Sequence, residues 1–316
     1  MTTPTTMRAI SQDELGAPDV LREVEIDRPA PGPSEVLVRV HAAGLNPTDW
    51  KHRQTPGFLG RLPLVLGWDV SGVVEALGVG VTIHEVGDEL FGMLPYPHGH
   101  GACAEYVTSP ARALVRKPTE LDHVEAAAVP LAALTAHQAL VEVASVQPGQ
   151  RVLIHAAAGG VGHFAVQIAK WLGAHVIGTA SAPKHDLLRT LGADELIDYR
   201  DVDFEEAAGK VDAVVDAVGG EYTARSLRTL VPGGILVSLA LSDTRPMPEE
   251  AAQLGVRHRL MLVEADQTGM LAVADLVRSG ALRPVVEATF PLEQAAKAHR
   301  LGDTGRVTGK VVLTVR

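Results

Sequence analysis

The sequence predicts an α/β protein in which a domain built on a doubly wound parallel sheet is inserted into a β-rich domain. Short runs of branched apolar residues, bounded by glycine, proline or aspartate, fill the first third of the chain. From about Val124, stretches of helical length alternate with short Val/Ile runs, and near Arg283 strand-like runs return. Alternating strands and helices are typical of a parallel sheet with helices on both faces. We therefore expect residues 1–123 and 284–316 to form the β-rich domain and residues 124–283 to form the inserted domain.

The elements of the β-rich domain are predicted from residue type and punctuation. Residues 36–40, 70–77 and 89–93 are expected strands because they are rich in branched residues and end near glycine, proline or aspartate. Helical periodicity is scarce in this part of the chain. Residues 285–290 and 310–315 are strand-like again, so we expect the C-terminal strands to return to this domain.

The inserted domain is predicted to alternate strand and helix along its length. Its expected strands are residues 151–155, 176–179, 195–197, 211–216 and 234–238. Its expected helices are residues 161–172, 184–191 and 222–230. This order predicts successive strand–helix–strand units, in which the strands all run in the same direction.

The composition limits the functions that the chain can have. With 46% hydrophobic and 21% charged residues among 316, the chain can bury a large core. A formal net charge of −10 argues against a general nucleic-acid surface, which needs clustered lysine and arginine. The first twenty residues lack the pattern of a signal peptide, and no window approaches the roughly 18 apolar residues of a membrane span, so we expect a cytoplasmic protein. A single cysteine, Cys103, excludes an intramolecular disulfide and a thiolate-rich zinc lobe.

A glycine cluster between an expected strand and an expected helix is the first candidate site. The stretch RVLIHAAAGGVGHFAVQIAK places the slots of the dinucleotide fingerprint G-x-G-x-x-G at Ala157, Gly159 and Gly162. Gly159 lets the backbone approach a pyrophosphate, Gly162 lets the helix pack close to the strand, and the helix N-terminus offers unpaired N–H groups. Ala157 departs from the fingerprint at the tight-turn slot, and a turn with no ligand is the alternative. We expect the cofactor to contact Ala158, Gly159, Gly160, Val161 and Gly162.

The residues after the second strand of the inserted domain indicate which dinucleotide is bound. In HVIGTASAPKHD, the position where an NAD site presents a carboxylate to the ribose carries Thr179 and Ser181, followed by Lys184. Hydroxyl groups and a cation suit a 2′-phosphate, which a carboxylate would repel. We therefore expect NADP(H) rather than NAD(H). The alternative for Lys184 is a solvated residue in the first turn of a helix.

Seven motifs in order, spread over nearly the whole chain, carry a resemblance to a known family. They are AAGLNPTDW (42–50), LPLVLGWDVSGVV (62–74), VGDELFGM (86–93), VPLAALTAHQAL (129–140), HAAAGGVG (155–162), GTASAPKHDLLRTLGADELIDY (178–199) and GRVTGKVVLTV (305–315). The chain resembles the zinc-independent quinone oxidoreductases of the medium-chain dehydrogenase/reductase superfamily. The resemblance implies a GroES-like catalytic domain, a Rossmann nucleotide-binding domain, and reduction of quinones or activated alkenes by NADPH without flavin.

The motifs differ from those of the superfamily's zinc alcohol dehydrogenases. Those enzymes bind zinc through a cysteine in the first motif and a His-Glu pair in the second, where this chain has Asn46 and Trp68-Asp69. We therefore expect no metal site. The alternative is PYPHGHGAC, where His98, His100 and Cys103 could bind zinc or copper, although their spacing matches no zinc pattern and the stretch is typical of a surface loop.

The resemblance also implies roles for single residues. Asn46 would lie beside the nicotinamide, Lys51 near the substrate, Thr135 at the nicotinamide end of the cofactor and Tyr199 near the adenosine phosphate. The remaining expected cofactor contacts are Val218, Leu239 and Leu241. We thus expect Asn46 and Lys51 to be catalytic.

Several of these residues can also serve the fold alone. Asn46 can cap a helix that has Pro47 at its first position and Asp49 at its third. Thr135 can bond to the backbone of its own helix. Tyr199 can be an aromatic residue at the edge of the core.

Two functions besides a reductase remain open from the sequence. The chain could hold NADPH in a structural or regulatory role with little turnover, because a fold does not guarantee catalysis. It could also be a zinc alcohol dehydrogenase with atypical ligands. The substrate pocket is expected near Trp50, Phe58, Trp68 and Leu94. Residues 258–266 have the pattern of a strand whose free edge could pair two copies in a homodimer.

Overall fold

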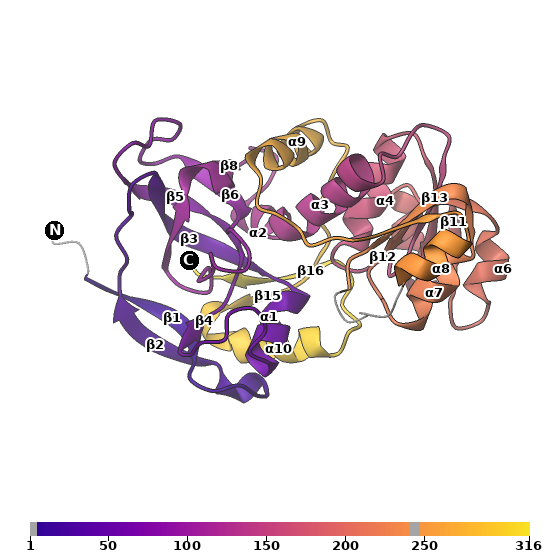
Figure 1. The fold of residues 1–316 in the computed structure, drawn as a ribbon. Coiled ribbons are helices and arrows are strands. Elements are labelled where there is room, and N and C mark those ends of the chain that lie inside the picture. Colours follow the sequence, from indigo (N-terminus) through magenta and orange to yellow (C-terminus); the bar gives the residue numbers. More distant parts are fainter. Residues whose placement is uncertain (1–4, 241–246) are drawn as a thin grey trace. The chain divides into compact units, whose positions relative to one another are not determined.

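The computed structural model describes residues 5–240 and 247–316, and the chain divides into two compact units (Figure 1). The first, here called the β-rich unit, comprises Met1–Leu134, Glu264–Gly280 and Pro284–Arg316. The second, here called the α/β unit, comprises Thr135–Val263 and Ala281–Arg283. Within the described residues, no helix combines the length and the apolar character needed to cross a membrane.

The α/β unit is built on six parallel strands, which confirms the doubly wound sheet. The strands are β9 (Arg151–Ile154), β10 (His175–Thr179), β11 (Glu195–Ile197), β12 (Val211–Asp216), β13 (Leu230–Ser238) and β14 (Arg257–Leu260). Their order in the sheet is β11-β10-β9-β12-β13-β14. This is the order of dinucleotide-binding domains, in which the first strands are added on one side of β9 and the later strands on the other. The helices are α4 (Gly162–Trp171), α5 (His185–Thr190), α6 (Phe204–Ala208), α7 (Glu221–Leu227) and α8 (Met247–Gln253).

Continuous burial explains why these short runs form a parallel sheet. Val152, Leu153 and Ile154 of β9 are all fully buried, although successive side chains of a strand point to opposite faces. Both faces of the sheet are therefore covered, as a parallel sheet requires. Leu153 and Ile177 from neighbouring strands share one apolar cluster with Phe204 of α6.

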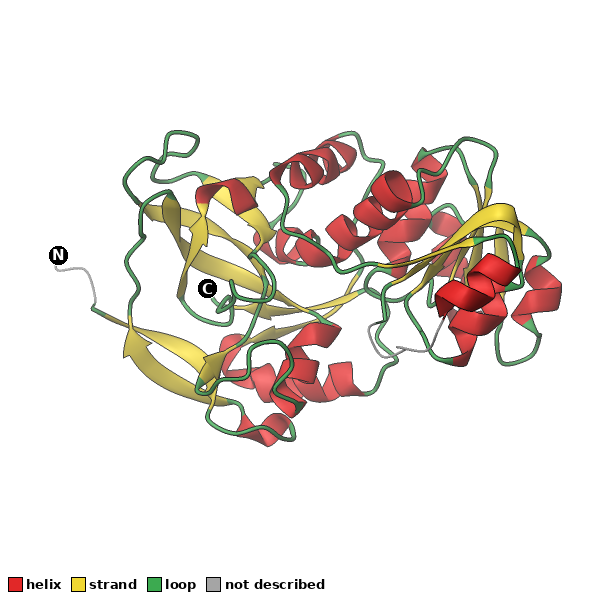
Figure 2. Ribbon diagram, viewed as in Figure 1, coloured by secondary structure: helices red, strands yellow, loops and turns green. Residues whose placement is uncertain are grey.

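The β-rich unit contains two sheets, shown as yellow arrows in Figure 2. Strands β1 (Thr6–Gln12), β2 (Arg22–Asp27) and β4 (Leu64–Val65) form the smaller sheet. The larger sheet contains β3 (Glu35–Leu45), β5 (Asp69–Leu77), β6 (Glu89–Met93), β7 (Tyr106–Pro110), β8 (Leu114–Arg116), β15 (Val286–Pro291) and β16 (Lys310–Thr314). Its helices are α1 (Pro47–Gln54), α2 (His123–Ala127), α9 (Gln267–Arg278) and α10 (Ala295–Asp303), and α3 (Pro130–His137) begins in this unit.

The last strand of the chain lies beside one of the first. β16 pairs antiparallel with β3, with Val311 opposite Leu45 and Thr314 opposite Ala42. The same strand β3 also pairs with β5 and β7, so it lies at the centre of the larger sheet. This pairing places the C-terminal strand in the β-rich unit.

Two segments cluster differently from the expected domain boundaries. Residues 124–134 and 264–280 were expected in the inserted domain, but they belong to the β-rich unit. Local contacts explain the first segment, because Ala127 and Ala128 share an apolar cluster with Ala42 of β3 and Val312 of β16. Helical composition alone does not indicate which sheet a helix covers.

The strand expected at residues 258–266 is shorter in the structure. β14 ends at Leu260, and it pairs through Leu260 with Ser238 of β13. The residues that follow, 261–266, are not in a strand. A free edge for pairing with a second copy is therefore limited to four residues.

Candidate functional site

The glycine turn of the α/β unit connects β9 to α4 through residues that leave no room for side chains. A Cβ atom on Gly162 would lie 2.2 Å from the carbonyl oxygen of Ala156 and 2.7 Å from the Cα atom of Ala157. A Cβ on Gly159 would lie 3.1 Å from the same Ala156 oxygen. The left-handed residue of the turn is Ala156, with φ 49°, so the tight turn falls one residue before the expected slot at Ala157. Gly162 is therefore required by packing alone.

This turn exposes backbone donors where a phosphate group would need them. Among the described residues, the N–H groups of Gly160, Val161 and Gly162 have no hydrogen-bond acceptor. Gly159, Gly160 and Val161 are partly exposed, whereas Ala158 is buried. Since α4 begins at Gly162, the positive end of its dipole adds to these donors. The turn fits the pyrophosphate of a dinucleotide.

Three strands deliver further residues to the same edge of the sheet. β9, β12 and β13 are parallel neighbours, so their carboxyl ends meet there. The Asp216 carboxylate at the end of β12 accepts hydrogen bonds from the N–H groups of Val218 (2.9 Å) and Gly219 (3.0 Å). This fixes a tight loop on which Val218 is 44% exposed. Leu239 follows β13 and donates its N–H to the carbonyl oxygen of Asp216 at 2.8 Å, while Leu241 lies outside the described residues.

Thr179 lies at this edge, but its hydroxyl proton is committed to a buried histidine. Ser226 Oγ donates to the Tyr222 carbonyl oxygen (2.6 Å), so it accepts from His155 Nε2 (2.8 Å). His155 Nδ1 is then unprotonated and accepts from Thr179 Oγ1 at 3.1 Å. Burial lowers the pKa of His155 to about 4, which keeps the ring neutral. Thr179 thus donates its hydroxyl proton to His155, and its contact with the cofactor stays a prediction.

The expected phosphate-reading residues gather in two adjoining loops after β10 and β11. Ala182 N–H donates to Asp198 Oδ2 at 2.7 Å, which ties the loop of Ser181 to that of Tyr199. Ser181 is buried and its hydroxyl does not cap the turn that follows. Lys184 ends that turn, and Tyr199 is 45% exposed.

These loops also carry two charges that the local sequence pattern did not indicate. The Arg200 guanidinium lies 5.8 Å from the centre of the Tyr199 ring. The Asp198 carboxylate accepts from the N–H groups of Arg200 and Ala182, which lower its pKa and keep it ionised. The two loops therefore combine two cations, Lys184 and Arg200, with the carboxylate of Asp198 and, further along the same loop, those of Asp201 and Asp203. Only the parallel pairing of β10 with β11 brings the two loops together.

The β-rich unit holds a buried polar cluster around Asn46. The Asn46 amide donates to Asp69 Oδ2 at 2.9 Å, and Lys310 Nζ donates to Asn46 Oδ1. Lys310 Nζ also lies 3.2 Å from Asp69 Oδ2, and all three side chains are at most 2% exposed. The other oxygen of Asp69 accepts the N–H of Leu131 at 2.7 Å. Lys310 was not identified from the sequence, because 264 residues separate it from Asn46.

Asp49 completes the cluster from the third position of α1. Its Oδ2 atom accepts the backbone N–H of Asn46 at 2.7 Å, as expected for a residue that supports the start of the helix. Its Oδ1 atom is buried without a hydrogen-bond partner. Burial raises the pKa of Asp49 to about 7, against the opposing effect of the Asn46 N–H. The carboxyl group therefore changes protonation near neutral pH.

The two expected catalytic residues lie in different surroundings. Asn46 precedes α1 in an extended conformation, so it occupies the expected N-cap position. Its side chain, however, bonds to Lys310 and Asp69. One N–H of its amide has no acceptor among the described residues. Lys51 is exposed on α1, and Thr135 is buried in α3.

Two of the residues expected to shape a substrate pocket are buried. Trp68 is 0% and Leu94 1% exposed, so both side chains lie in the core. Phe58 is 54% exposed. Large apolar side chains are commonly buried in the core. The sequence alone did not show that Trp68 is one of them.

The three residues that the sequence offered as alternative metal ligands, His98, His100 and Cys103, have different surroundings. His98 is exposed, whereas His100 Nδ1 bonds to the carbonyl oxygen of Val65 at 2.8 Å. Cys103 is buried, and burial raises the pKa of its thiol. In the part of the chain that the structure describes, no three His, Cys, Asp or Glu side chains are grouped for a metal ion.

Family models match both parts of the chain. The model of the alcohol dehydrogenase GroES-like domain matches residues 32–119, and that of the zinc-binding dehydrogenase domain matches residues 191–313. The chain is 33% identical to the chloroplastic quinone-oxidoreductase homolog of Spinacia oleracea, over 94% of this chain and 95% of that protein. It is 36% identical to the 2-haloacrylate reductase of a Burkholderia species, over 94% and 96%.

Some relatives are much longer than this chain. Mycoketide-CoA synthase of Mycobacterium tuberculosis is 39% identical over 89% of this chain, but the match spans only 7% of the synthase. A pikromycin polyketide synthase component of Streptomyces venezuelae is 39% identical over 90% of this chain and 8% of its own length.

Solved structures share the whole fold. The quinone oxidoreductase of Coxiella burnetii has a TM-score of 0.94 and 39% identity, over 98% of this chain and 100% of that one. A mycobacterial protein solved with NADPH has a TM-score of 0.87 and 34% identity, over 98% and 100%. A structure named as an NAD-dependent alcohol dehydrogenase has a TM-score of 0.90 and 36% identity, again over 98% and 100%.

Proposed function

The chain belongs to the quinone oxidoreductase family of the medium-chain dehydrogenase/reductase superfamily, and from this premise we propose that it is an NADPH-dependent, zinc-independent reductase of quinones or α,β-unsaturated carbonyls. The observation that carries the proposal is the set of free N–H groups at Gly160, Val161 and Gly162, at the carboxyl edge of a parallel sheet. Bound NADPH would supply the hydride.

Different residues of the α/β unit bind different parts of the cofactor. The glycine turn holds the pyrophosphate through backbone donors. Lys184, Ser181 and Tyr199 hold the 2′-phosphate, and Arg200 adds a second cation. Val218 and Leu239 contact the cofactor from the ends of β12 and β13. The ionised Asp198 weakens the preference for a 2′-phosphate, so the cations must outweigh it.

The residues of the β-rich unit contribute polarity at the reacting centre. Asn46, held by Lys310 and Asp69, keeps one amide N–H for the substrate or the nicotinamide, and the exposed amine of Lys51 comes from α1, the helix that Asn46 precedes. The negative charge that develops on a quinone or enone oxygen is delocalised and can be stabilised by such donors. The Lys310 ammonium group, rather than a metal ion, is the cation that Asn46 and Asp69 share.

A binding and turnover experiment tests the proposal. The apo protein is titrated with NADPH and NADH, and the complex is then mixed with a panel of quinones and enones in a stopped-flow instrument with excess chelator. We expect tighter binding of NADPH and chelator-resistant oxidation by at least one acceptor. Tight binding without oxidation by any acceptor would instead support a binding protein with little turnover.

Metal analysis of the purified protein distinguishes the proposed reductase from the remaining alternative, a zinc alcohol dehydrogenase with atypical ligands. We expect less than 0.1 equivalent of zinc, on the order expected from incidental contamination. Stoichiometric zinc, with activity lost on chelation, would establish an alcohol dehydrogenase with atypical ligands. In that case the interpretation of Asn46 and Asp69 would be wrong.

The edge of the six-stranded sheet suggests how a homodimer could form. β14 is the last strand in the sheet order, and Leu260 and Leu262 beside its edge are 52% and 43% exposed. We propose that two copies pair along this edge. Sedimentation of the wild type and of Leu260→Asp at micromolar concentration tests it, and an unchanged dimer in the variant would contradict this interface.

A further inference from the structure

Tyr96 lies in the loop after β6, inside a group of aromatic rings of the β-rich unit. Its ring centre is 5.3 Å from that of Trp68, 5.9 Å from that of His52 and 6.1 Å from that of Phe58. Trp68 is fully buried, whereas Phe58 is 54% exposed, so the group extends from the core to the surface. Tyr96 itself is half-buried. Its ring is therefore held by packing, and the residue is partly exposed to solvent.

Hydrogen bonds to Tyr96 determine where its own proton can go. His52 Nδ1 lies 2.9 Å from the carbonyl oxygen of Thr48, and a carbonyl oxygen only accepts, so Nδ1 carries the proton. The same N–H lies 3.1 Å from Thr48 Oγ1, which accepts from it. Thr48 Oγ1 then donates its own hydrogen to Tyr96 Oη at 3.2 Å.

The Tyr96 hydroxyl consequently has a spare donor. Its oxygen already accepts from Thr48, and its own hydrogen has no acceptor among the described residues. Burial raises the pKa of Tyr96, and the nearby Asp49 carboxylate acts in the same direction, so the phenol stays protonated at neutral pH. A half-buried O–H group that is fixed in direction and lacks a partner is suited to donate to a ligand.

We propose that Tyr96 donates its hydroxyl proton to the carbonyl oxygen of the substrate, with Thr48 and His52 as positioning residues. The proposal rests on the proposed reductase function. After the substrate has accepted hydride at carbon, the electron pair of its carbonyl π bond resides on oxygen. The Tyr96 O–H bond then breaks, its electron pair stays on the phenol oxygen, and the proton bonds to the substrate oxygen to give an enol. From a quinone this enol is a hydroxycyclohexadienone, which becomes the hydroquinone when its CH2 carbon loses a proton to solvent and its remaining carbonyl oxygen gains one. Solvent water returns a proton to the phenolate.

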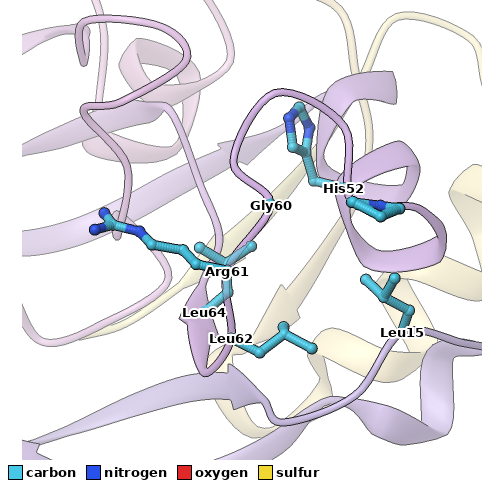
Figure 3. Close-up of a pocket in the computed structure, with 7 residues that line it drawn as sticks. Leu15, His52, Gly60, Arg61, Leu62 and Leu64 are labelled. Carbon is cyan, nitrogen blue, oxygen red and sulfur yellow. The ribbon is translucent and has the colours of Figure 1, made fainter.

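The surroundings of His52 hold this chain of donors in place. A Cβ on Gly57 would lie 2.7 Å from His52 Nε2, so the loop after α1 packs directly on the ring. His52, which lies on α1, also lines a cavity of about 150 Å³ together with Arg61 and apolar side chains (Figure 3). This volume is large enough for several water molecules, since one needs about 10–15 Å³. Solvent thus comes close to His52, the first donor of the chain.

The aromatic group also indicates the substrate class within the proposed function. Exposed Phe58 and half-buried Tyr96 lie edge to face at 90°, so two partly exposed aromatic rings lie next to each other. A flat, conjugated substrate can stack on such a surface, whereas a saturated carbonyl compound cannot. A cyclic enone or a quinone suits the site better than a short aliphatic enone.

The substitution Tyr96→Phe tests the proposal, because it removes the hydroxyl and keeps the ring. With 2-cyclohexenone or 1,4-benzoquinone as the acceptor, we expect kcat to fall about 100-fold, as is typical of a lost general acid. The Kd for NADPH should not change. The control Tyr106→Phe makes the same change in the same unit, where Tyr106 is buried beneath the Arg28 guanidinium, and should retain wild-type kcat.

A second pair of variants tests the positioning role of Thr48. Thr48→Val removes the hydroxyl that donates to Tyr96, and we expect a fall in kcat of about tenfold with KM changed less than twofold. Thr48→Ser restores a hydroxyl and should recover most of the lost kcat. Equal losses in both variants would indicate a structural effect of the site and would contradict the positioning role.

The possible outcomes separate this proposal from the function on which it rests. An active wild type with Tyr96→Phe within threefold of it would overturn the role of Tyr96 and leave the reductase function intact. A wild type that no quinone or enone oxidises would overturn the reductase function, and this proposal with it. A 100-fold loss in Tyr96→Phe, with NADPH binding retained and Tyr106→Phe unaffected, would support both.

Discussion

The Nζ atom of Lys310 lies 3.2 Å from Oδ2 of Asp69, and both side chains are buried although 241 residues separate them. Lys310 is on β16 and Asp69 on β5, the two strands that flank β3 in the larger sheet. Asn46, at the end of β3, bonds to both of them. The ion pair thus joins the last strand of the chain to β5, and Asn46 connects both residues to the start of α1.

Replacing Lys310 with methionine is expected to destabilise the β-rich unit by about 3–5 kcal/mol, because it leaves the Asp69 carboxylate buried without its cation. Chemical denaturation followed by tryptophan fluorescence measures the change, since Trp50 and Trp68 both lie in this unit. The double variant Asp69→Asn with Lys310→Met should recover part of the loss. A single variant within 1 kcal/mol of the wild type would contradict the importance of the pair.

Replacing Gly162 with alanine is expected to abolish cofactor binding, because the new Cβ would lie 2.2 Å from the Ala156 oxygen and force the turn apart. Gly159→Ala is the matched variant, since its Cβ would lie 3.1 Å from the same atom. We expect Gly159→Ala to fold normally and bind NADPH at least tenfold more weakly. Fluorescence titration with NADPH measures both, and wild-type affinity in Gly162→Ala would exclude the turn as the pyrophosphate site.

Replacing Lys184 with alanine is expected to raise KM for NADPH about tenfold and to leave KM for NADH within twofold, because only NADPH carries the 2′-phosphate. Lys170→Ala is the control, since that lysine pairs with Asp194 at 2.6 Å. Initial-rate measurements with both cofactors provide the comparison. Equal changes for NADPH and NADH would rule out the assignment of Lys184 to the 2′-phosphate.

Acidification is expected to destabilise the α/β unit through His155. Its pKa is about 4 in the folded chain and near 6.5 when unfolded, so the unfolded state binds more protons between these values and stability falls as pH falls. The loss is roughly 3 kcal/mol by pH 4, from about 1.4 kcal/mol per pKa unit. In the β-rich unit, Asp49 acts in the opposite sense, because its raised pKa of about 7 costs stability as pH rises from 4 to 7.

The comparison that isolates His155 uses His155→Gln and the exposed His98→Gln as control. Unfolding free energies between pH 7 and pH 4, measured by hydrogen exchange of β9 and β12 amides, should depend less on pH in His155→Gln. His98→Gln should follow the wild type. Parallel pH profiles for His155→Gln and the wild type would show that His155 does not carry the effect.

Local patterns predicted much of the α/β unit. The strand at β12 begins and ends at the expected residues, and those at β9 and β10 agree within one residue. These strands could be predicted because a strand that is covered on both faces appears in the sequence as a short continuous run of apolar residues. The glycine turn between β9 and α4 was also predicted, and the structure adds that its left-handed residue is Ala156, one residue before the fingerprint slot at Ala157.

Residues that act through distant partners were not predicted. The hydroxyl of Thr179 donates to His155, whose other partner Ser226 lies 71 residues further along the chain, and the sequence did not indicate this bond. Tyr96 carried no motif, and its spare donor appears only when Thr48, 48 residues earlier, is placed beside it. No local spacing indicates such pairs.

The sequence by itself determined the order of strands and helices, the glycine turn and the absence of a carboxylate at the ribose position. Each of these depends on neighbours within a few residues, through backbone conformation and side-chain period. The tertiary structure alone decided which polar groups are satisfied and which remain free: Lys310 saturates Asn46 Oδ1 from the far end of the chain, and Thr48 leaves the Tyr96 proton unused. The physical reason is that a buried donor or acceptor is satisfied by whichever group folding brings within about 3 Å, regardless of its distance in the sequence.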